Sequence, residues 1–137
     1  MYLLDTNVVS ELRKHKPHAG VVAWIAAAPE DSLYISAVTV GEIQAGIEIT
    51  RRQDTAKASE IEAWLDDVAQ SFGVLAADAP IFRRWAQLLH GRPDHHLEDA
   101  FIAATALVRG LRVVTRNVRD FEPFGVQLIN PFARTGG

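Results

Sequence analysis

The chain alternates short apolar runs with longer segments of helical pattern along its whole length. Five runs have the composition of β-strands, and they lie at Tyr2–Leu4, Ser32–Ser36, Gly73–Ala76, Leu111–Thr115 and Val126–Ile129. Strands that alternate with helices favour a parallel sheet, because parallel neighbours need a crossover connection. The pattern therefore predicts an α/β fold, a three-layer α/β/α sandwich around a central parallel sheet. We expect one domain over residues 1–133 and a frayed tail at 134–137.

The first apolar run ends in an acid. Asp5 follows Leu4 directly, and a hydroxyl at Thr6 and an amide at Asn7 come next. In open α/β sheets, ligand sites lie at the carboxyl ends of the strands. The sequence thus predicts that Asp5 belongs to such a site.

A second acid, Glu42, lies one turn into the helix expected over Val38–Thr50. The helix face that carries it is otherwise small or apolar, and a carboxylate on such a face is costly unless it is paired or bound to a cation. Gly46 shares this face. Because glycine lowers helix propensity by about 1 kcal/mol relative to alanine, we expect close packing against a neighbour at Gly46.

Further acids and an amide come from the last third of the chain. Glu98 and Asp99 open an apolar helix that Gly110 ends, and acids at a helix start also suit the macrodipole without any other role. Asn117 and Asp120 follow the next strand. We expect Asp99, with Asn117 or Asp120, to reach the same sheet edge as Asp5.

Crowded carboxylates repel one another, and a hard divalent cation removes that repulsion. The sequence has no Cys, and an oxygen-only set of ligands favours Mg²⁺ or Mn²⁺ over zinc. The adjacent His95 and His96 lack a third soft ligand at helical spacing, so we interpret them as part of a polar loop. The pattern favours hydrolysis of a phosphodiester by metal-activated water.

Composition narrows the class of protein further. The net charge is −3, which is not typical of a protein that binds nucleic acid by bulk charge alone. No apolar stretch approaches the roughly 20 residues of a membrane span, and the N-terminus lacks the pattern of a cleavable leader. The absence of Cys suits a reducing compartment. We expect a soluble, cytoplasmic protein without a membrane partner.

Five stretches carry a resemblance to a known family. They read LLDTNVVSE from Leu3, YISAVTVGEI from Tyr34, EDAFIAATA from Glu98, VTRNVRDFE from Val114 and LINPF from Leu128. In this order they resemble the PIN-domain ribonucleases of the VapC toxin family, and within it the FitB-like branch, of type II toxin–antitoxin systems. The segment from 51 to 92 carries no diagnostic motif.

The resemblance implies an Mg²⁺- or Mn²⁺-dependent endoribonuclease that arrests growth. It also implies a homodimer and a cognate antitoxin that covers the active site, with DNA contacted only through the antitoxin. By position, Asp5, Glu42 and Asp99 match the acidic triad of the family, and Asp5 and Asp99 are the expected direct metal ligands. The family often has a fourth acid after the late strand. Here either Asn117 or Asp120 would complete the catalytic set.

The same resemblance suggests contacts to the RNA substrate. Thr6 and Thr115 would position phosphate or water, and Arg116 would hold the RNA backbone together with Arg84 and the basic segment 13–16. Two alternatives stay open. One is a catalytically idle PIN-fold module for binding or dimerisation, and the other is an Mg²⁺-dependent phosphotransfer enzyme. Against the second, Asn7 stands where the haloacid-dehalogenase pattern needs an Asp.

Overall fold

The structure is a computed structural model that describes residues 1–92 and 97–133. The expected tail at 134–137 and the pair His95 and His96 lie outside the described residues. The elements, in chain order, are β1 (Tyr2–Leu4), α1 (Thr6–Glu11), α2 (Ala19–Ala27), β2 (Leu33–Ser36), α3 (Ala37–Arg51), α4 (Thr55–Ser71), β3 (Gly73–Leu75), α5 (Ala79–Leu89), α6 (Leu97–Arg109), β4 (Arg112–Val114), α7 (Val118–Phe121), the 3₁₀ helix η1 (Glu122–Phe124) and β5 (Leu128–Ile129). Within the described ranges, no helix combines the length and hydrophobicity needed to cross a membrane.

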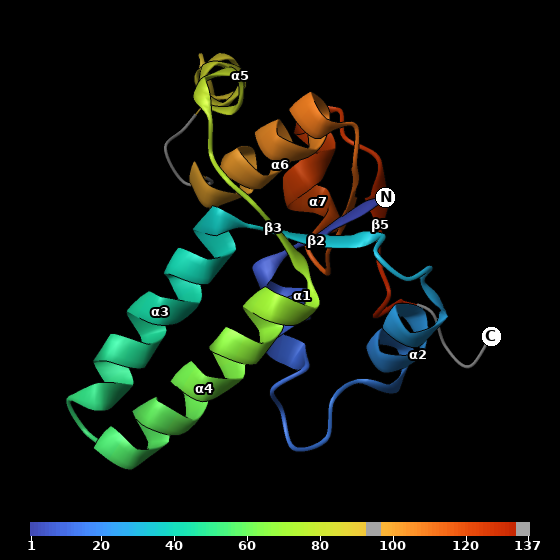
Figure 1. The fold of residues 1–137 in the computed structure, drawn as a ribbon. Helices are drawn as coiled ribbons and strands as arrows, with labels where there is room; N and C mark the ends of the chain where they lie inside the picture. The colour runs from blue at the N-terminus through green and yellow to red at the C-terminus, as the bar shows by residue number, and fades with distance from the viewer. Residues whose placement is uncertain (93–96, 134–137) are drawn as a thin grey trace.

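The five strands form one parallel sheet in the order β3-β2-β1-β4-β5. The central strand β1 pairs with β2 on one side and β4 on the other, with Leu4 opposite both Ile35 and Val114. Helices α5, α6 and α7 cover one side of this sheet, and α1 to α4 lie on the other (Figure 1). The predicted three-layer α/β/α sandwich with a parallel sheet is confirmed.

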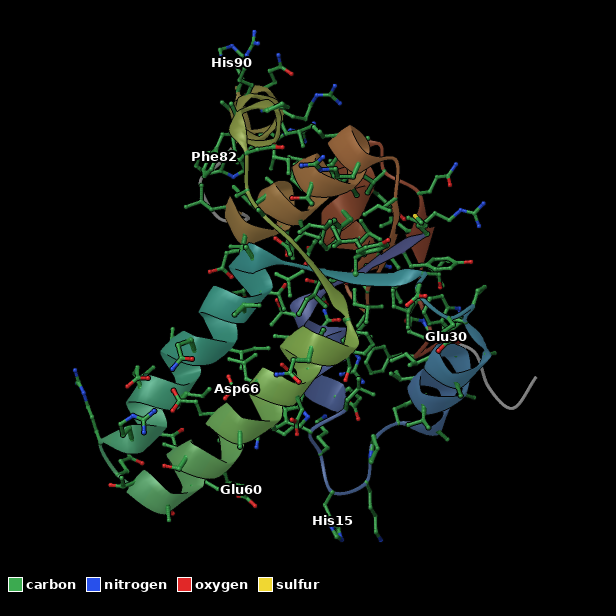
Figure 2. All side chains as sticks on the ribbon, viewed as in Figure 1. His15, Glu30, Glu60, Asp66, Phe82 and His90 are labelled. Carbon is green, nitrogen blue, oxygen red and sulfur yellow. The ribbon has the colours of Figure 1, made fainter. Side chains whose placement is uncertain are left out.

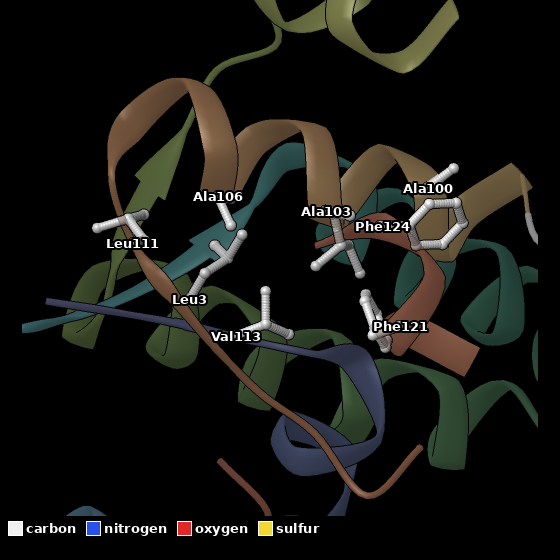
Figure 3. Packing of buried hydrophobic residues seen from close by; sticks show 9 residues of the cluster. Leu3, Ala100, Ala103, Ala106, Leu111, Val113, Phe121 and Phe124 are labelled. Atoms are coloured by element: carbon white, nitrogen blue, oxygen red, sulfur yellow. The ribbon is translucent and has the colours of Figure 1, made fainter. Parts of the chain in front are cut away.

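Successive residues of β1 build the two halves of the core, because side chains alternate between the faces of a strand. Leu3 packs with residues of α6, α7 and η1, as Figure 3 shows, whereas Leu4 packs with residues of α1, α2 and α4. In β4, Val113 and Val114 divide between the two halves in the same way. Both Leu3 and Leu4 are fully buried. This packing fixes the register of β1, and so the position of the acid that follows it.

Helix α6 is the buried helix that the sequence predicted. All seven residues from Ala100 to Ala106 are buried. The small side chains Ala103 and Ala106 let the helix lie close against Leu3 and Val113 of the sheet (Figure 3). Gly110 follows the helix with φ of 69°, a left-handed conformation that glycine adopts without strain.

Helices α3 and α4 form a hairpin that projects from the sheet (Figure 1). Ser36, the last residue of β2, is the N-cap of α3, and its hydroxyl accepts the backbone N–H of Val38 at 3.1 Å. Strand and helix therefore meet without a linker, which sets the first turns of α3 beside the carboxyl end of the sheet. The expectation of close packing at Gly46 is wrong, because a Cβ there would meet nothing within 4 Å.

Candidate active site

Asp5 lies at the carboxyl end of β1, where it is also the N-cap of α1. Its side chain is almost fully buried, with 4% of the residue exposed. The carboxylate accepts three hydrogen bonds: the backbone N–H of Thr6 reaches Oδ1 at 2.8 Å, and Oδ2 receives Asn7 Nδ2 at 3.0 Å and Thr115 Oγ1 at 2.8 Å. The donors come from both ends of the chain, so the complete fold is needed to hold this acid.

Burial raises the pKa of Asp5, because a carboxylate loses its hydration when it is covered. The hydrogen bonds from Thr115, Thr6 and Asn7 oppose this effect by favouring the ionised form, and the nearby charge of Glu98 adds to the rise. The donors therefore favour the ionised form of a carboxyl whose burial favours the neutral form.

Glu42 lies one turn into α3 and faces the same region. Thr6 Oγ1 donates to Glu42 Oε1 over 3.1 Å, and Thr6 and Thr39 share a second hydrogen bond of 3.0 Å. Burial, together with a hydrogen bond to the Glu98 carboxyl and the charge of Glu98, raises the pKa of Glu42 to about 8. Two carboxyl groups can share a hydrogen bond only if one of them holds a proton. With a pKa of about 8, Glu42 favours its protonated form at neutral pH.

The sequence predicted Asp99 for the site but not its neighbour Glu98. Burial is the main cause of the raised pKa values of Asp5 and Glu42, and the charge of Glu98 adds to both. Asp99, the next residue of α6, is partly buried in the first turn of the same helix. The adjacent acids were the available signal, but the resemblance matched only the second of them.

Thr115 directly follows β4 and is fully buried. Its hydroxyl donates to Asp5 and accepts the backbone N–H of Asn117 at 2.9 Å. Asn117 is exposed and is the N-cap of α7, although its side chain makes no capping hydrogen bond. Asp120 lies one turn further on, partly buried, and its backbone N–H donates to the carbonyl of Asn117 at 3.1 Å. The structure thus ties Asn117 to Asp5 through Thr115.

The predicted basic residues do not all gather at this edge. The backbone N–H of Arg116 donates to Asn7 Oδ1 at 3.3 Å, which places Arg116 next to the acids. His15 lies at the outer end of the loop between α1 and α2 (Figure 2), and Lys14 in that loop pairs with Glu11 at 2.9 Å. Arg84 belongs to α5, which packs on α6 on the opposite side of the sheet from α1 (Figure 1).

A trough of about 310 Å³ leads away from the acids between α1 and α3. Thr6 and Glu42 lie at the end it shares with the acids, and Trp64 of α4 is also part of its wall. Its full lining is Thr6, Ser10, Arg13, Glu42, Ile43, Gly46, Ile47, Thr50, Ile61 and Trp64. The open space at Gly46 is part of this trough.

Residues 1–92 and 97–133 contain no group of three or more acids or histidines placed closely enough to hold a metal ion as they stand. The acids are instead linked in sequence: Asp5 and Glu42 both bond to Thr6, and Glu42 bonds to Glu98. Their donor chemistry nevertheless fits a hard cation, since every candidate ligand is an oxygen. The raised pKa of Glu42, to which the charges of Glu98 and Asp5 contribute, is consistent with acids that repel one another at this site.

A PIN domain model matches residues 2–124, which is most of the chain. The chain belongs to the PIN-domain family. The matched span includes every acid described above, from Asp5 to Asp120.

Several relatives of this PIN domain match nearly its whole length. It is 39% identical to the plasmid stability protein StbB of Pseudomonas syringae pathovar tomato, over 96% of this chain and 99% of that protein. It is 36% identical to the VapC ribonuclease Y4jK of Sinorhizobium fredii, over 96% of this chain and 98% of that protein. The crystal structure of FitAcB from Neisseria gonorrhoeae superposes with a TM-score of 0.86 at 32% identity, covering 98% of this chain and all of that one. The predicted placement with the VapC and FitB proteins is confirmed.

Proposed function

We propose that this PIN domain is a ribonuclease and the toxin of a type II toxin–antitoxin pair, acting on RNA in the cytoplasm. The observation that carries the proposal is the buried Asp5 carboxylate, which three donors hold beside the Glu42–Glu98 pair at the carboxyl end of the sheet. The VapC ribonuclease and the toxin FitB, at 36% and 32% identity, support the same activity. Ribonucleases of this family generally depend on a divalent metal.

The ion that we propose is Mg²⁺, with Mn²⁺ as a substitute, held by Asp5 and Asp99. The oxygen-only donor set and the surplus of negative charge around Glu42 support this choice. When bound, such a cation lowers the pKa of a water molecule and stabilises charge on the phosphate oxygens. Asn117 is the better supported candidate for the fourth position, because its amide caps no helix end and Thr115 fixes its backbone beside Asp5.

The roles of this chain's own residues follow from their contacts. Thr115 and Asn7 orient the Asp5 carboxylate, while Thr6 gives its backbone N–H to Asp5 and its hydroxyl to Glu42. Because the Thr115 hydroxyl is buried and already bonded, we assign it to positioning Asp5 in place of contacting phosphate. Glu42 holds a proton at neutral pH, so it can exchange a proton with a reacting group beside it.

The proposed partners are RNA, a cognate antitoxin and a second copy of the chain. Solved structures similar to this chain include FitAB bound to a DNA fragment, with a TM-score of 0.84 at 30% identity. We infer that DNA is contacted only through the antitoxin. The trough that begins at Thr6 and Glu42 offers a surface beside the acids for an antitoxin segment to cover.

Incubation of the purified protein with structured RNA, in Mg²⁺ and in EDTA, tests the activity. Wild type should cleave RNA only with the cation, and Asp5→Asn should lose at least about 100-fold in rate, as is usual when an enzyme loses an electrostatic contact at the reacting centre. Asp66→Asn is the matched control, because Asp66 is exposed on α4 (Figure 2) and its replacement removes the same charge. Cleavage that survives Asp5→Asn would contradict the assignment. A wild type that never cleaves would favour the idle binding module.

Calorimetric titration with Mn²⁺ tests the ligand assignment separately. Asp99→Asn should abolish binding of the ion while the circular dichroism spectrum stays that of a folded protein. An unchanged titration would remove Asp99 from the proposed ligands.

A further inference from the structure

Arg116 is held in an aromatic stack at the edge of the candidate site. The Cζ atom of its guanidinium lies 4.3 Å from the centre of the Phe132 ring. His18 also packs on the Phe132 ring, with the two ring centres 5.2 Å apart. Phe132 is itself fixed, because its backbone N–H donates to Asn130 Oδ1 at 3.0 Å. Residues from three separate parts of the sequence thus meet at the Phe132 ring.

The backbone of Arg116 is fixed to the same acids that define the site. Its N–H donates to Asn7 Oδ1, and Asn7 Nδ2 donates in turn to Asp5. The preceding residue, Thr115, gives its hydroxyl to Asp5. Arg116 is therefore one hydrogen-bonded residue away from Asp5 along two separate routes.

The Arg116 guanidinium has no polar partner among the described residues. Among the described residues, the Arg116 side chain makes no hydrogen bond and no ion pair, and its residue is exposed. The charge of Arg116 helps to lower the pKa of Glu11, but the two do not form an ion pair. The carboxylate oxygens of Glu11 already bond to Lys14 and to the backbone N–H of His18. By contrast, the guanidinium groups of four arginines in the described ranges already bond to acids, a carbonyl or an amide: Arg51, Arg92, Arg109 and Arg112.

An arginine stacked on a ring contacts the ring with one face and leaves its edge of N–H donors free. That edge matches the oxygens of a phosphate, to which it can donate two parallel hydrogen bonds. Since the ring limits the motion of the side chain, less conformational entropy is lost when a phosphate binds. An immobilised cation next to a cluster of acids thus has the properties of an anion subsite.

We propose that Arg116, stacked on Phe132, is a phosphate subsite that binds a backbone phosphate of single-stranded RNA next to the cleaved bond. The proposal rests on the ribonuclease function proposed above. The subsite would hold the RNA strand at a fixed position relative to Asp5. Asn7 bonds to both Arg116 and Asp5, and Thr115, the residue before Arg116, also bonds to Asp5. It would carry no base specificity, since phosphate contacts position a nucleic acid without reading its sequence.

The test is the salt dependence of binding, measured by fluorescence anisotropy with a labelled single-stranded oligoribonucleotide in EDTA, where cleavage does not interfere. Each phosphate contact on a single strand adds about 0.7 to the slope of log affinity against log salt. Arg116→Ala should lower the magnitude of that slope by about 0.7. The ratio of wild-type affinity to variant affinity should therefore fall about 2.6-fold when KCl is raised from about 50 to about 200 mM. Arg52→Ala is the matched control, because Arg52 is exposed at the C-cap of α3, in the turn that leads to α4 and at the opposite end of α3 from the strand β2. It should leave the slope unchanged.

Two further variants separate charge from geometry. Arg116→Lys keeps the charge, so the slope should stay near that of wild type, while the affinity should fall because the paired donors and the planar stack are lost. Phe132→Leu keeps an apolar contact but removes the ring, and it should weaken binding severalfold with little change in slope.

An unchanged slope in Arg116→Ala would overturn the subsite, and so would an equal decrease in Arg52→Ala or a wild type that does not bind the strand. If Phe132→Leu binds as tightly as wild type, the stacking is not what prepares Arg116. Cleavage in Mg²⁺ is measured independently. If wild type cleaves RNA but Arg116→Ala has an unchanged slope, the nuclease assignment stands and the subsite is refuted. If the slope of Arg116→Ala is lowered but wild type does not cleave, the subsite stands and the nuclease assignment is refuted.

Discussion

Replacement of Thr115 by valine tests how the fold maintains the Asp5 carboxylate. Thr115→Val keeps the branched shape of a fully buried side chain and deletes only the hydroxyl that donates to Asp5 at 2.8 Å. The same hydroxyl accepts the backbone N–H of Asn117, but Asn117 is exposed and water can replace that acceptor. The main loss is therefore one of the three donors to a buried acid.

The size of the loss depends on the charge of Asp5. A hydrogen bond to an ionised group contributes about 1.5–3 kcal/mol and one between neutral groups about 1 kcal/mol. Because Asp5 keeps the donors Thr6 and Asn7, it is not left unpaired, and the lower half of the first range applies. We expect Thr115→Val to lower the free energy of unfolding by about 2 kcal/mol where Asp5 is ionised and by about 1 kcal/mol where it is protonated.

The pH dependence has a definite sign. Burial already raises the pKa of Asp5 in the folded protein above its ordinary value of 3.8, and losing the Thr115 donor raises it further. The folded variant then binds more protons than the unfolded chain over a wider range above 3.8. Stability falls with rising pH wherever the folded state binds the extra protons. The cost of Thr115→Val should consequently grow as the pH rises from acid to neutral.

Urea denaturation at a series of pH values, in EDTA, measures this cost. Thr105→Val is the control, because Thr105 is also buried but donates to the carbonyl of Phe101, one turn back in α6, at 2.9 Å. That carbonyl has a helical N–H partner as well, and no acid is involved, so its cost should be under about 1 kcal/mol and independent of pH. A cost for Thr115→Val that does not change with pH, or that equals the cost of Thr105→Val, would refute the reasoning.

Two other predictions concern α3. Glu42→Gln removes a carboxyl whose pKa rises from 4.5 to about 8 on folding. Wild type should lose stability as the pH rises between these two values, and the variant should not. Urea midpoints in EDTA should make the variant the more stable protein above pH 8, and a wild type that stays ahead there would contradict the shift. Gly46→Ala and Gly41→Ala should each stabilise the protein by about 1 kcal/mol, because alanine favours a helix and neither Cβ would meet an atom within 4 Å. If Gly46→Ala destabilises the protein while Gly41→Ala stabilises it, Gly46 is closely packed after all.

The sequence predicted the fold because its local patterns are strong and agree with one another. Apolar pairs such as Leu3 and Leu4 have no polar alternative, so they must be buried on opposite faces of a sheet, and this fixes where Asp5 falls. The apolar composition of α6 likewise left only a central position for that helix. That Asp5 and Glu42 lie near the carboxyl end of the sheet could be predicted, because the burial of the neighbouring elements is decided locally.

The remaining details depend on contacts between distant segments. Glu98 and Asp99 are adjacent at a helix start, and only the packing of α6 decides that the charge of Glu98 reaches both Asp5 and Glu42. The stack of Arg116 on Phe132 likewise joins the ends of β4 and β5, which no local pattern reveals. At Gly46, propensity alone cannot distinguish a tight contact from the open trough that the structure has there.

The comparison of Asp5 with Glu42 shows that donors, as well as burial, set the charge at this site. Asp5 is nearly inaccessible, yet three donors hold its carboxylate and oppose the rise in its pKa. Glu42 is less buried but receives one hydroxyl, from Thr6, and has the Glu98 carboxyl beside it, so its pKa reaches about 8. The fold thus places a carboxylate supported by donors next to a carboxyl that keeps its proton. Two acids that both accept a hydrogen bond from Thr6 therefore have different surroundings, and this difference sets the extent to which the pKa of each is raised.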